Sequence, residues 1–149
     1  MAKILILELR QSKEDLTVRS LSIVNEILQD NEIIADTISV DEPFSLLYSA
    51  SISLELYDYD GMIILGCLLE DAASENKIIY KEILRCFSDL SLHYALPVGF
   101  GFLFAKDREE SALLIAEKSK RAVLSCLDLI KLKNQFGLID NEPFTRYSN

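Results

Sequence analysis

The fold of this chain is decided by the stretch GMIILGCLLEDAASE at residues 61–75, together with LPVGFGFLF at residues 96–104. Each contains an apolar run, which is typical of a strand covered on both faces in a parallel sheet. The segment between them carries apolar residues at helical spacing, including Ile83, Phe87 and Leu90. Strand, loop, helix and strand in this order form the repeating unit of parallel α/β sheets.

The rest of the chain continues this alternation. The predicted elements, in order, are strands at 3–9, 33–40, 62–65 and from 97, alternating with helices at about 12–30, 43–54, 74–94 and 107–132. The sequence therefore predicts a single α/β domain with a four-stranded parallel sheet flanked by helices. Residues 133–149 lose helical periodicity and contain Gly137 and Pro143, so we expect a C-terminal tail or arm there.

Composition narrows the class of protein. The 149 residues suffice for one domain with a real core, and a 50% hydrophobic content is that of a folded chain. The formal net charge of −9 argues against general binding to nucleic acids or anionic membranes, which needs a basic surface. A small anionic ligand stays compatible with this charge, because a few local donors can hold it.

The cysteines and the single histidine argue against a disulfide framework or a zinc site. Cys67, Cys86 and Cys126 are widely spaced without a CxxC pair, and His93 is the one histidine. Reduced thiols are typical of a cytosol-like compartment. The first apolar run is too short for a signal peptide, and no run is long enough to span a membrane, so we expect a cytoplasmic protein.

Candidate ligand-binding segments follow the predicted strands, because the carboxyl ends of parallel strands meet at one edge of the sheet. These segments are 10–12, 41–45, 68–75 and 104–106. No Gly-rich loop of the P-loop type and no Ser, His and acid set fall at this edge, so nucleotide triphosphate and serine hydrolase chemistry find no support.

The acidic residues Glu70, Asp71 and Glu75 permit two interpretations. Paired carboxylates can carry out acid–base chemistry or hold a divalent cation. Acids just before a helix also complement its dipole without any catalytic role. His93, predicted in the last turn of a helix, suits the dipole there rather than catalysis.

Two further features of the sequence also permit more than one interpretation. Gly99 and Gly101 lie inside a predicted strand, where glycine indicates close approach by a ligand, a neighbouring subunit or a packed helix. Lys118, Lys120 and Arg121 can grip a phosphate, or they can form a solvated helix face with i,i+4 ion pairs.

Four stretches resemble lumazine synthase, the riboflavin synthase beta-chain family: LGCLL at 65–69, DLSL at 89–92, LPVGFGFL at 96–103 and REESAL at 108–113. The spacing of the other elements fits this family from Lys3 to about Leu132. The resemblance implies a flavodoxin-like three-layer sandwich. It also implies a homo-oligomer built of pentamers, which in this family pair into decamers or form icosahedral shells, with active sites between adjacent subunits.

The resemblance also implies a reaction. The family is a transferase of riboflavin biosynthesis that condenses 5-amino-6-ribitylamino-uracil with 3,4-dihydroxy-2-butanone 4-phosphate to give 6,7-dimethyl-8-ribityllumazine, water and phosphate. It uses no metal or organic cofactor. The implied partners are the pyrimidine and sugar-phosphate substrates and riboflavin synthase, with no nucleic acid and no membrane. Such chemistry depends mainly on holding two reactants together, with a proton shuttle and an anion site.

The family's functional positions map onto this chain residue by residue. The catalytic position corresponds to Glu75, and Lys120 matches the lysine of the phosphate motif. Phe44 and Phe100 match aromatic residues that shape the ring pocket. The other substrate-binding positions are Gln11, Ser45, Leu68, Leu69, Ala73 and Ser74.

Several positions depart from the family pattern. The family has histidine where this chain has Glu75, and its phosphate loop reads Asp71-Ala72-Ala73 here. Two hypotheses follow: a divergent lumazine synthase, or a catalytically eroded member that acts as an oligomeric scaffold or flavin-type ligand binder. A negatively charged crevice at 70–75 favours the scaffold. A third hypothesis, a flavodoxin-like binding module of another family, would be favoured by a monomeric protein.

Overall fold

The computed structural model describes residues 2–10 and 14–140, and it contains four strands and four helices in strict alternation. In chain order they are β1 (Lys3–Leu9), α1 (Glu14–Asp30), β2 (Ile34–Val40), α2 (Ser45–Leu56), β3 (Gly61–Leu69), α3 (Glu75–Tyr94), β4 (Val98–Ala105) and α4 (Arg108–Asp140).

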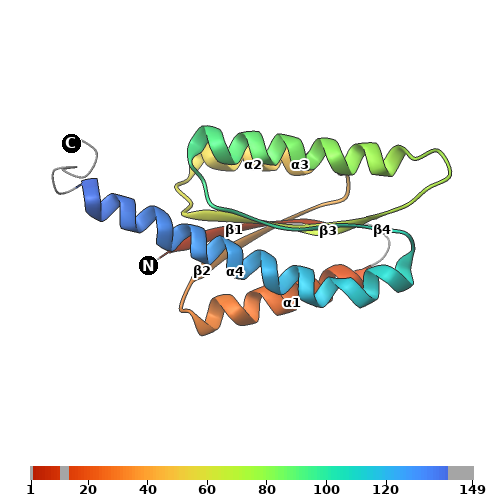
Figure 1. The fold of residues 1–149 in the computed structure, drawn as a ribbon, viewed down its shortest axis with the longest axis horizontal. Coiled ribbons are helices and arrows are strands. Elements are labelled where there is room, and N and C mark those ends of the chain that lie inside the picture. Colours follow the sequence, from red (N-terminus) through yellow and green to blue (C-terminus); the bar gives the residue numbers. More distant parts are fainter. Residues whose placement is uncertain (1, 11–13, 141–149) are drawn as a thin grey trace, which may run out of the picture.

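The strands form one parallel sheet between two layers of helices. Their order is β2-β1-β3-β4, with α1 and α4 on one face and α2 and α3 on the other (Figure 1). This arrangement confirms the predicted flavodoxin-like three-layer sandwich. Among the described residues, no helix is long and apolar enough to cross a membrane.

The two central strands are apolar on both sides because both of their faces are covered. Leu5 and Leu7 of β1 lie in the core cluster under α2 and α3, whereas Ile4 and Ile6 lie in the cluster under α1 and α4. All four side chains are fully buried. Burial of each contributes roughly 1.5–3 kcal/mol, which is why an unbroken apolar run forms a strand at the centre of the sheet.

Strand β3 is longer than predicted. It runs to Leu69 instead of ending near Leu65, because Cys67, Leu68 and Leu69 pair with the end of β4. Gly66 does not end the strand. It adopts a φ of 149°, which glycine tolerates, and pairing with β4 continues past it.

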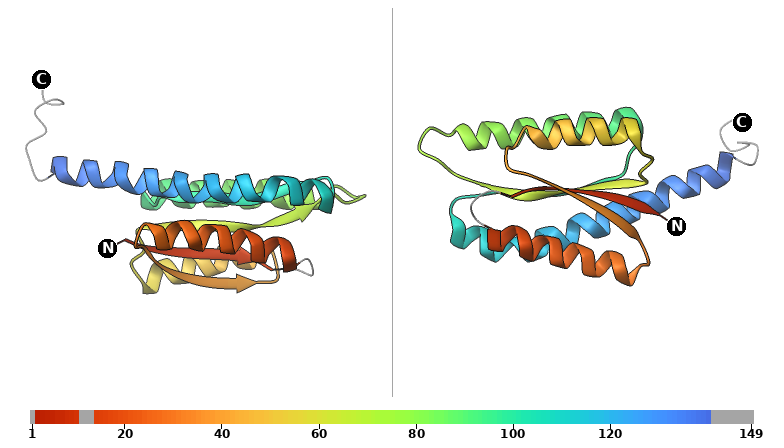
Figure 2. Two further views of the ribbon diagram at one scale, coloured as in Figure 1. Left: turned by 90° about the horizontal axis from the view of Figure 1, so that it is seen from below. Right: turned by 180° about the vertical axis from the view of Figure 1, so that it is seen from behind.

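Helix α4 is also longer than predicted. It has 33 residues and runs to Asp140, and its last turns extend beyond the sheet (Figure 2). Gly137 lies within it, exposed, with space around its Cα. A single glycine costs a helix only about 1 kcal/mol, so it did not mark the end. The remainder of the predicted tail, 141–149, lies outside the described residues.

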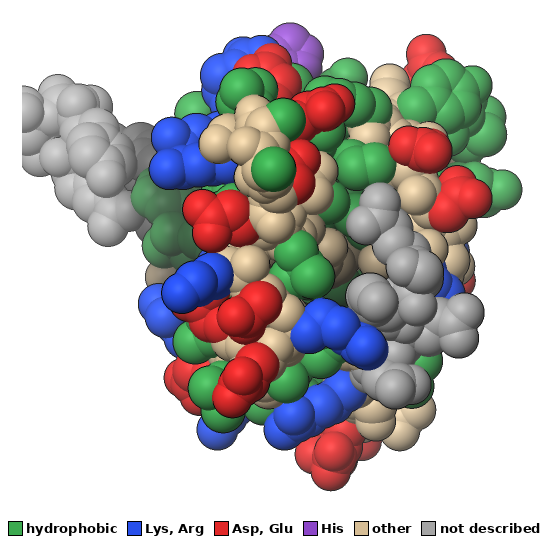
Figure 3. Space-filling view, turned by 90° about the vertical axis from the view of Figure 1, so that its right-hand side faces the viewer, with side chains coloured by type: hydrophobic (Ala, Val, Ile, Leu, Met, Phe, Trp, Pro, Cys, Tyr) green, Lys and Arg blue, Asp and Glu red, His purple; other side chains and the backbone are tan. Residues whose placement is uncertain are grey.

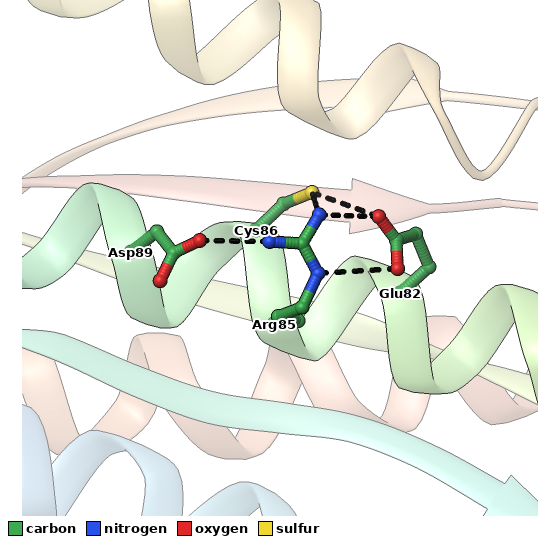
Figure 4. Close-up of polar contacts among 4 residues, drawn as sticks. All are labelled: Glu82, Arg85, Cys86 and Asp89. Carbon is green, nitrogen blue, oxygen red and sulfur yellow. Dashed lines mark hydrogen bonds and ion pairs between the residues drawn. The ribbon is translucent and has the colours of Figure 1, made fainter.

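The outer face of α3 carries a network of charges (Figure 4). Arg85 donates to Glu82 three residues before it and to Asp89 four residues after it, the latter at 2.9 Å. Such exposed pairs add a few tenths of a kcal/mol to a helix and indicate a solvated surface. His93 lies exposed in the last turn of the same helix, as predicted.

The glycines of β4 have a structural explanation. A Cβ added to Gly99 would lie 2.1 Å from the carbonyl oxygen of Ala122, and one added to Gly101 would lie 3.3 Å from the Cβ of Ala122. Helix α4 therefore packs directly on the backbone of β4. Of the interpretations left open for these glycines, close packing by a helix is confirmed.

Alkaline pH is expected to destabilise the fold through Cys126, which is fully buried between α4 and the sheet. Burial raises the pKa of its thiol from 9.0 to about 12. The contribution of the protonated thiol to the free energy of unfolding is fully present below pH 9. It is lost as the pH rises from 9 to 12, because only the unfolded chain releases this proton in that range. Urea unfolding at about pH 8 and pH 10.5 should show a loss roughly 2 kcal/mol larger for the wild type than for Cys126→Ala.

Cys86→Ala is the matched control for this measurement, because it removes a partly exposed thiol and leaves Cys126 in place. It should retain the alkaline loss. Equal losses in the wild type and in Cys126→Ala would contradict the prediction.

Candidate functional site

The carboxyl ends of the four strands form the edge of the sheet that carries the candidate site. Figure 3 views the molecule from this end and shows basic and acidic side chains interspersed over it. Arg10, Asp41, Glu70 and Lys106 follow the four strands directly, so the topology brings all four segments to one edge, as predicted.

A pocket of about 440 Å³ opens at this edge beside β1 and β2. It is lined by Arg10, Ser39, Val40, Asp41 and Ser45. The backbone N–H of Arg10 donates to the carbonyl of Val40 at 2.7 Å, which extends the pairing of the two strands to the pocket. The wall thus combines a guanidinium, two hydroxyls and a carboxylate, a set suited to a polar, uncharged or weakly anionic ligand.

Sequence reasoning missed Glu8, which lies just behind this wall. Its side chain is fully buried, its Oε1 lies 2.8 Å from Nη2 of Arg10, and the same oxygen accepts a hydrogen bond from the Ser39 hydroxyl. The signal available in the sequence was an acidic residue inside an otherwise apolar central strand.

The predicted residues around α2 lie next to the pocket. Ser45 begins α2 and lines the pocket, and Phe44 stands immediately before it, with half of its surface exposed. Helix α2 begins here because Pro43 ends the extended chain and the first turns close on Glu42 and Pro43. Gln11, another predicted position, lies outside the described residues.

The predicted residues of the β3–α3 loop are arranged along its length. Leu68 is buried in the core and Leu69 is partly buried, whereas Ala73, Ser74 and Glu75 are exposed. These loop residues do not line the pocket beside β1 and β2.

A residue that sequence reasoning missed, Asn76, holds this loop. Its side-chain amide donates to the carbonyl of Leu69 at 2.8 Å, and its backbone N–H donates to Asp71 at 3.4 Å. Ser74 adopts a left-handed conformation with φ of 56°, which turns the chain into the helix.

The acidic residues of this loop support the structural interpretation. Asp71 accepts a backbone N–H in the first turn of α3, and Glu75 lies in that turn, where a negative charge complements the helix dipole. Within residues 2–10 and 14–140, no group of three His, Cys, Asp or Glu side chains is arranged to hold a metal ion.

Phe100 and Lys120 lie away from the pocket of their own chain. Phe100 packs on the core cluster under α2 and α3, whereas Lys120 is exposed on α4, which covers the other face. Neither lines the pocket. Within one copy of the chain, Phe100 and Lys120 therefore do not meet Ser45 at this pocket.

The basic cluster on α4 is not neutralised by the predicted helix pairs. Among the described residues, Lys120 and Arg121 form no ion pair. Desolvation, followed by the nearby charge of Arg121, lowers the pKa of Lys118, which is half-buried. The charges of Lys120 and Arg121 are thus not paired with an acidic side chain of the described residues.

The fold and this edge pocket define a flavodoxin-like α/β protein with a candidate ligand site at the carboxyl ends of its strands. A sequence model of the 6,7-dimethyl-8-ribityllumazine synthase family matches residues 2–134, and the chain belongs to this family. The resemblance seen in the sequence is thereby confirmed.

Individual relatives are distant. The chain is similar to 6,7-dimethyl-8-ribityllumazine synthase of Picrophilus torridus, with 33% identity over 75 residues, which are 50% of this chain and 55% of that protein. The enzyme of the same name from Bartonella tribocorum is 30% identical over 74% of this chain and 76% of its own length. That from Methanoculleus marisnigri is 28% identical over 66% of this chain and 73% of its own length.

Proposed function

We propose that this protein is a lumazine synthase, a transferase that condenses 5-amino-6-ribitylamino-uracil with 3,4-dihydroxy-2-butanone 4-phosphate in riboflavin biosynthesis. The family match over residues 2–134 carries the proposal. A cytoplasmic homo-oligomer of pentamers, with riboflavin synthase as a partner that uses the product, belongs to the same proposal.

The proposed site joins two copies of the chain. In one copy, the pocket beside β1 and β2 takes the pyrimidine, with Ser45 in its wall and Phe44 next to Ser45 in the chain. The adjoining copy supplies Phe100 against the ring and Lys120 to the phosphate. Holding both reactants in one pocket supplies most of the acceleration, because it removes the entropic cost of their encounter. Glu75 stands at the proton-transfer position.

A second candidate function is an oligomeric scaffold or flavin-type ligand binder without catalysis. The acidic β3–α3 loop favours it: Glu70 and Glu75 are exposed and Asp71 is partly exposed, where the enzyme would hold a phosphate. These negative charges would repel a phosphate, and the loop at 70–75 contains no basic residue.

Three measurements separate the two candidates. The purified protein should convert the two substrates to fluorescent 6,7-dimethyl-8-ribityllumazine faster than the spontaneous background, and light scattering should show an oligomer. An oligomer without turnover that binds riboflavin would establish the second candidate instead. A monomer would remove the basis of both, because each relies on adjoining copies.

Lys120→Ala is expected to weaken binding of the phosphate-bearing substrate by about 1–3 kcal/mol, because a charge-assisted contact to phosphate is lost. Steady-state kinetics should show a higher Michaelis constant for this substrate and an unchanged one for the pyrimidine. Lys131→Ala, which removes another exposed lysine from the same helix, is the matched control. An unchanged constant in Lys120→Ala would remove this residue from the site.

A further inference from the structure

Glu8 is the feature of the fold that packing does not explain. It lies in the central strand β1, where every neighbour along the strand from Ile4 to Leu9 is apolar and buried. Its side chain is only 1% exposed, yet it ends in a carboxylate. Removing such a group from water costs several kcal/mol even after the protein relaxes.

The partners of Glu8 compensate for only part of this cost. Oε1 lies 2.8 Å from Nη2 of Arg10 and also accepts a hydrogen bond from the hydroxyl of Ser39. Oε2 is buried and has no hydrogen-bond partner among the described residues. Replacing both members of a buried ion pair by apolar residues of similar volume is often neutral or stabilising, so such a pair is weak evidence of a stabilising role. Stability therefore does not account for an acid at this position.

Both partners of Glu8 belong to the pocket wall. Arg10 and Ser39 line the pocket, and the Arg10 side chain is 41% exposed there while one end of its guanidinium is bound to Glu8. A guanidinium has five N–H donors in a rigid plane, so binding at one end fixes the direction of the others. The Ser39 hydroxyl donates its hydrogen bond to Glu8, so its oxygen remains available to accept one from a ligand.

We propose that Glu8 is a positioning residue, whose buried carboxylate holds Arg10 as a donor and Ser39 as an acceptor on the wall of the pocket beside β1 and β2. The ligand class that fits this wall has carbonyl or hydroxyl oxygens beside an O–H or N–H group, as in a polyol chain or a pyrimidinedione edge. The inference rests on the proposed function only for the choice of probes.

The first measurement is binding. Fluorescence titration with 6,7-dimethyl-8-ribityllumazine and with riboflavin should show affinities about tenfold lower for Glu8→Gln than for the wild type, since oriented hydrogen bonds to a charged group are lost. Arg10→Ala should show a loss at least as large. Adding Glu8→Gln to Arg10→Ala should cause little further loss, because Glu8 acts through Arg10. Glu26→Gln, an exposed acid on α1, is the matched control.

The second measurement separates positioning from packing. Glu8→Leu removes a buried carboxylate oxygen that has no partner among the described residues, and the 41% exposed Arg10 can turn to water, so the unfolding temperature should change little. The variant should bind the probes about as weakly as Glu8→Gln. In nitrogen-15 NMR spectra, the guanidinium signals of Arg10 should be those of a slowly rotating group in the wild type and of a freely rotating one in both variants.

The outcomes of these measurements distinguish a failure of the inference on Glu8 from a failure of the proposed function. Equal probe affinity in the wild type and in Glu8→Gln, or an Arg10 signal unchanged by the substitution, overturns the inference and leaves the proposed function standing. Normal probe binding that depends on Glu8 without any turnover overturns the proposed function and supports the inference. A wild-type protein that binds neither probe overturns both.

Discussion

Gly99→Ala is expected to lower the free energy of unfolding by about 3 kcal/mol, one of the two largest effects that we predict. The added Cβ would lie 2.1 Å from the carbonyl oxygen of Ala122 and 2.8 Å from its carbonyl carbon. Both atoms belong to the backbone of α4, so relief requires that the whole helix move away from the sheet. Urea unfolding followed by circular dichroism measures the change.

Gly137→Ala is the matched control, because the same methyl group is added to a glycine with nothing within 4 Å. Alanine is a better helix former than glycine, so this variant should gain about 0.5–1 kcal/mol in the free energy of unfolding. A loss of less than about 1 kcal/mol in Gly99→Ala would show that α4 does not seat on β4 as described.

Phe102→Ala is expected to cost about 3–5 kcal/mol, the second large effect. Phe102 of β4 is fully buried, and its ring stacks on Tyr80 with 5.5 Å between the ring centroids. The tyrosine hydroxyl donates to the backbone carbonyl of Phe102, a bond that the substitution retains. The neighbouring strands cannot collapse into the cavity, so most of the lost contact is not regained.

Thermal and urea unfolding of Phe102→Ala should both report this loss. Phe136→Ala is the matched control, because its ring is 45% exposed on the overhanging part of α4 and should cost less than about 1 kcal/mol. Similar losses in the two variants would contradict the burial that the fold assigns to Phe102.

Most of the architecture could be predicted because the periodicity of the sequence reflects which faces are buried. The run at 3–9 is apolar throughout because β1 is covered on both sides, and the helices show one apolar stripe because they are covered on one. The roles of the glycines were harder to predict from the sequence. The same lack of a side chain at Gly99 serves a ligand, a subunit or a helix, and only the approach of Ala122 decides among them.

The ends of elements could not be predicted where no apolar periodicity marks them. Helix α4 continues past Leu132 as an exposed helix, which needs no apolar stripe, and β3 continues past Gly66 through pairing with β4.

The location of the candidate site could be predicted from the sequence, whereas the side-chain contacts within it could not. Strand topology alone places the edge, and Ser45 lines its pocket. Glu8 is buried by two layers of helices and a neighbouring strand, which come together only in the folded chain. Its contacts with Arg10 and Ser39 therefore could not be predicted from the sequence pattern.

The contact of α4 with the bare backbone of β4 has a consequence for how one subunit would meet another. Lys120 precedes Ala122 by two residues, and Phe100 follows Gly99, so the two residues flank a seam where main chain meets main chain. Side chains can rotate or repack, whereas this seam has no such freedom. This contact therefore sets the backbone positions from which the Phe100 ring and the flexible Lys120 side chain extend.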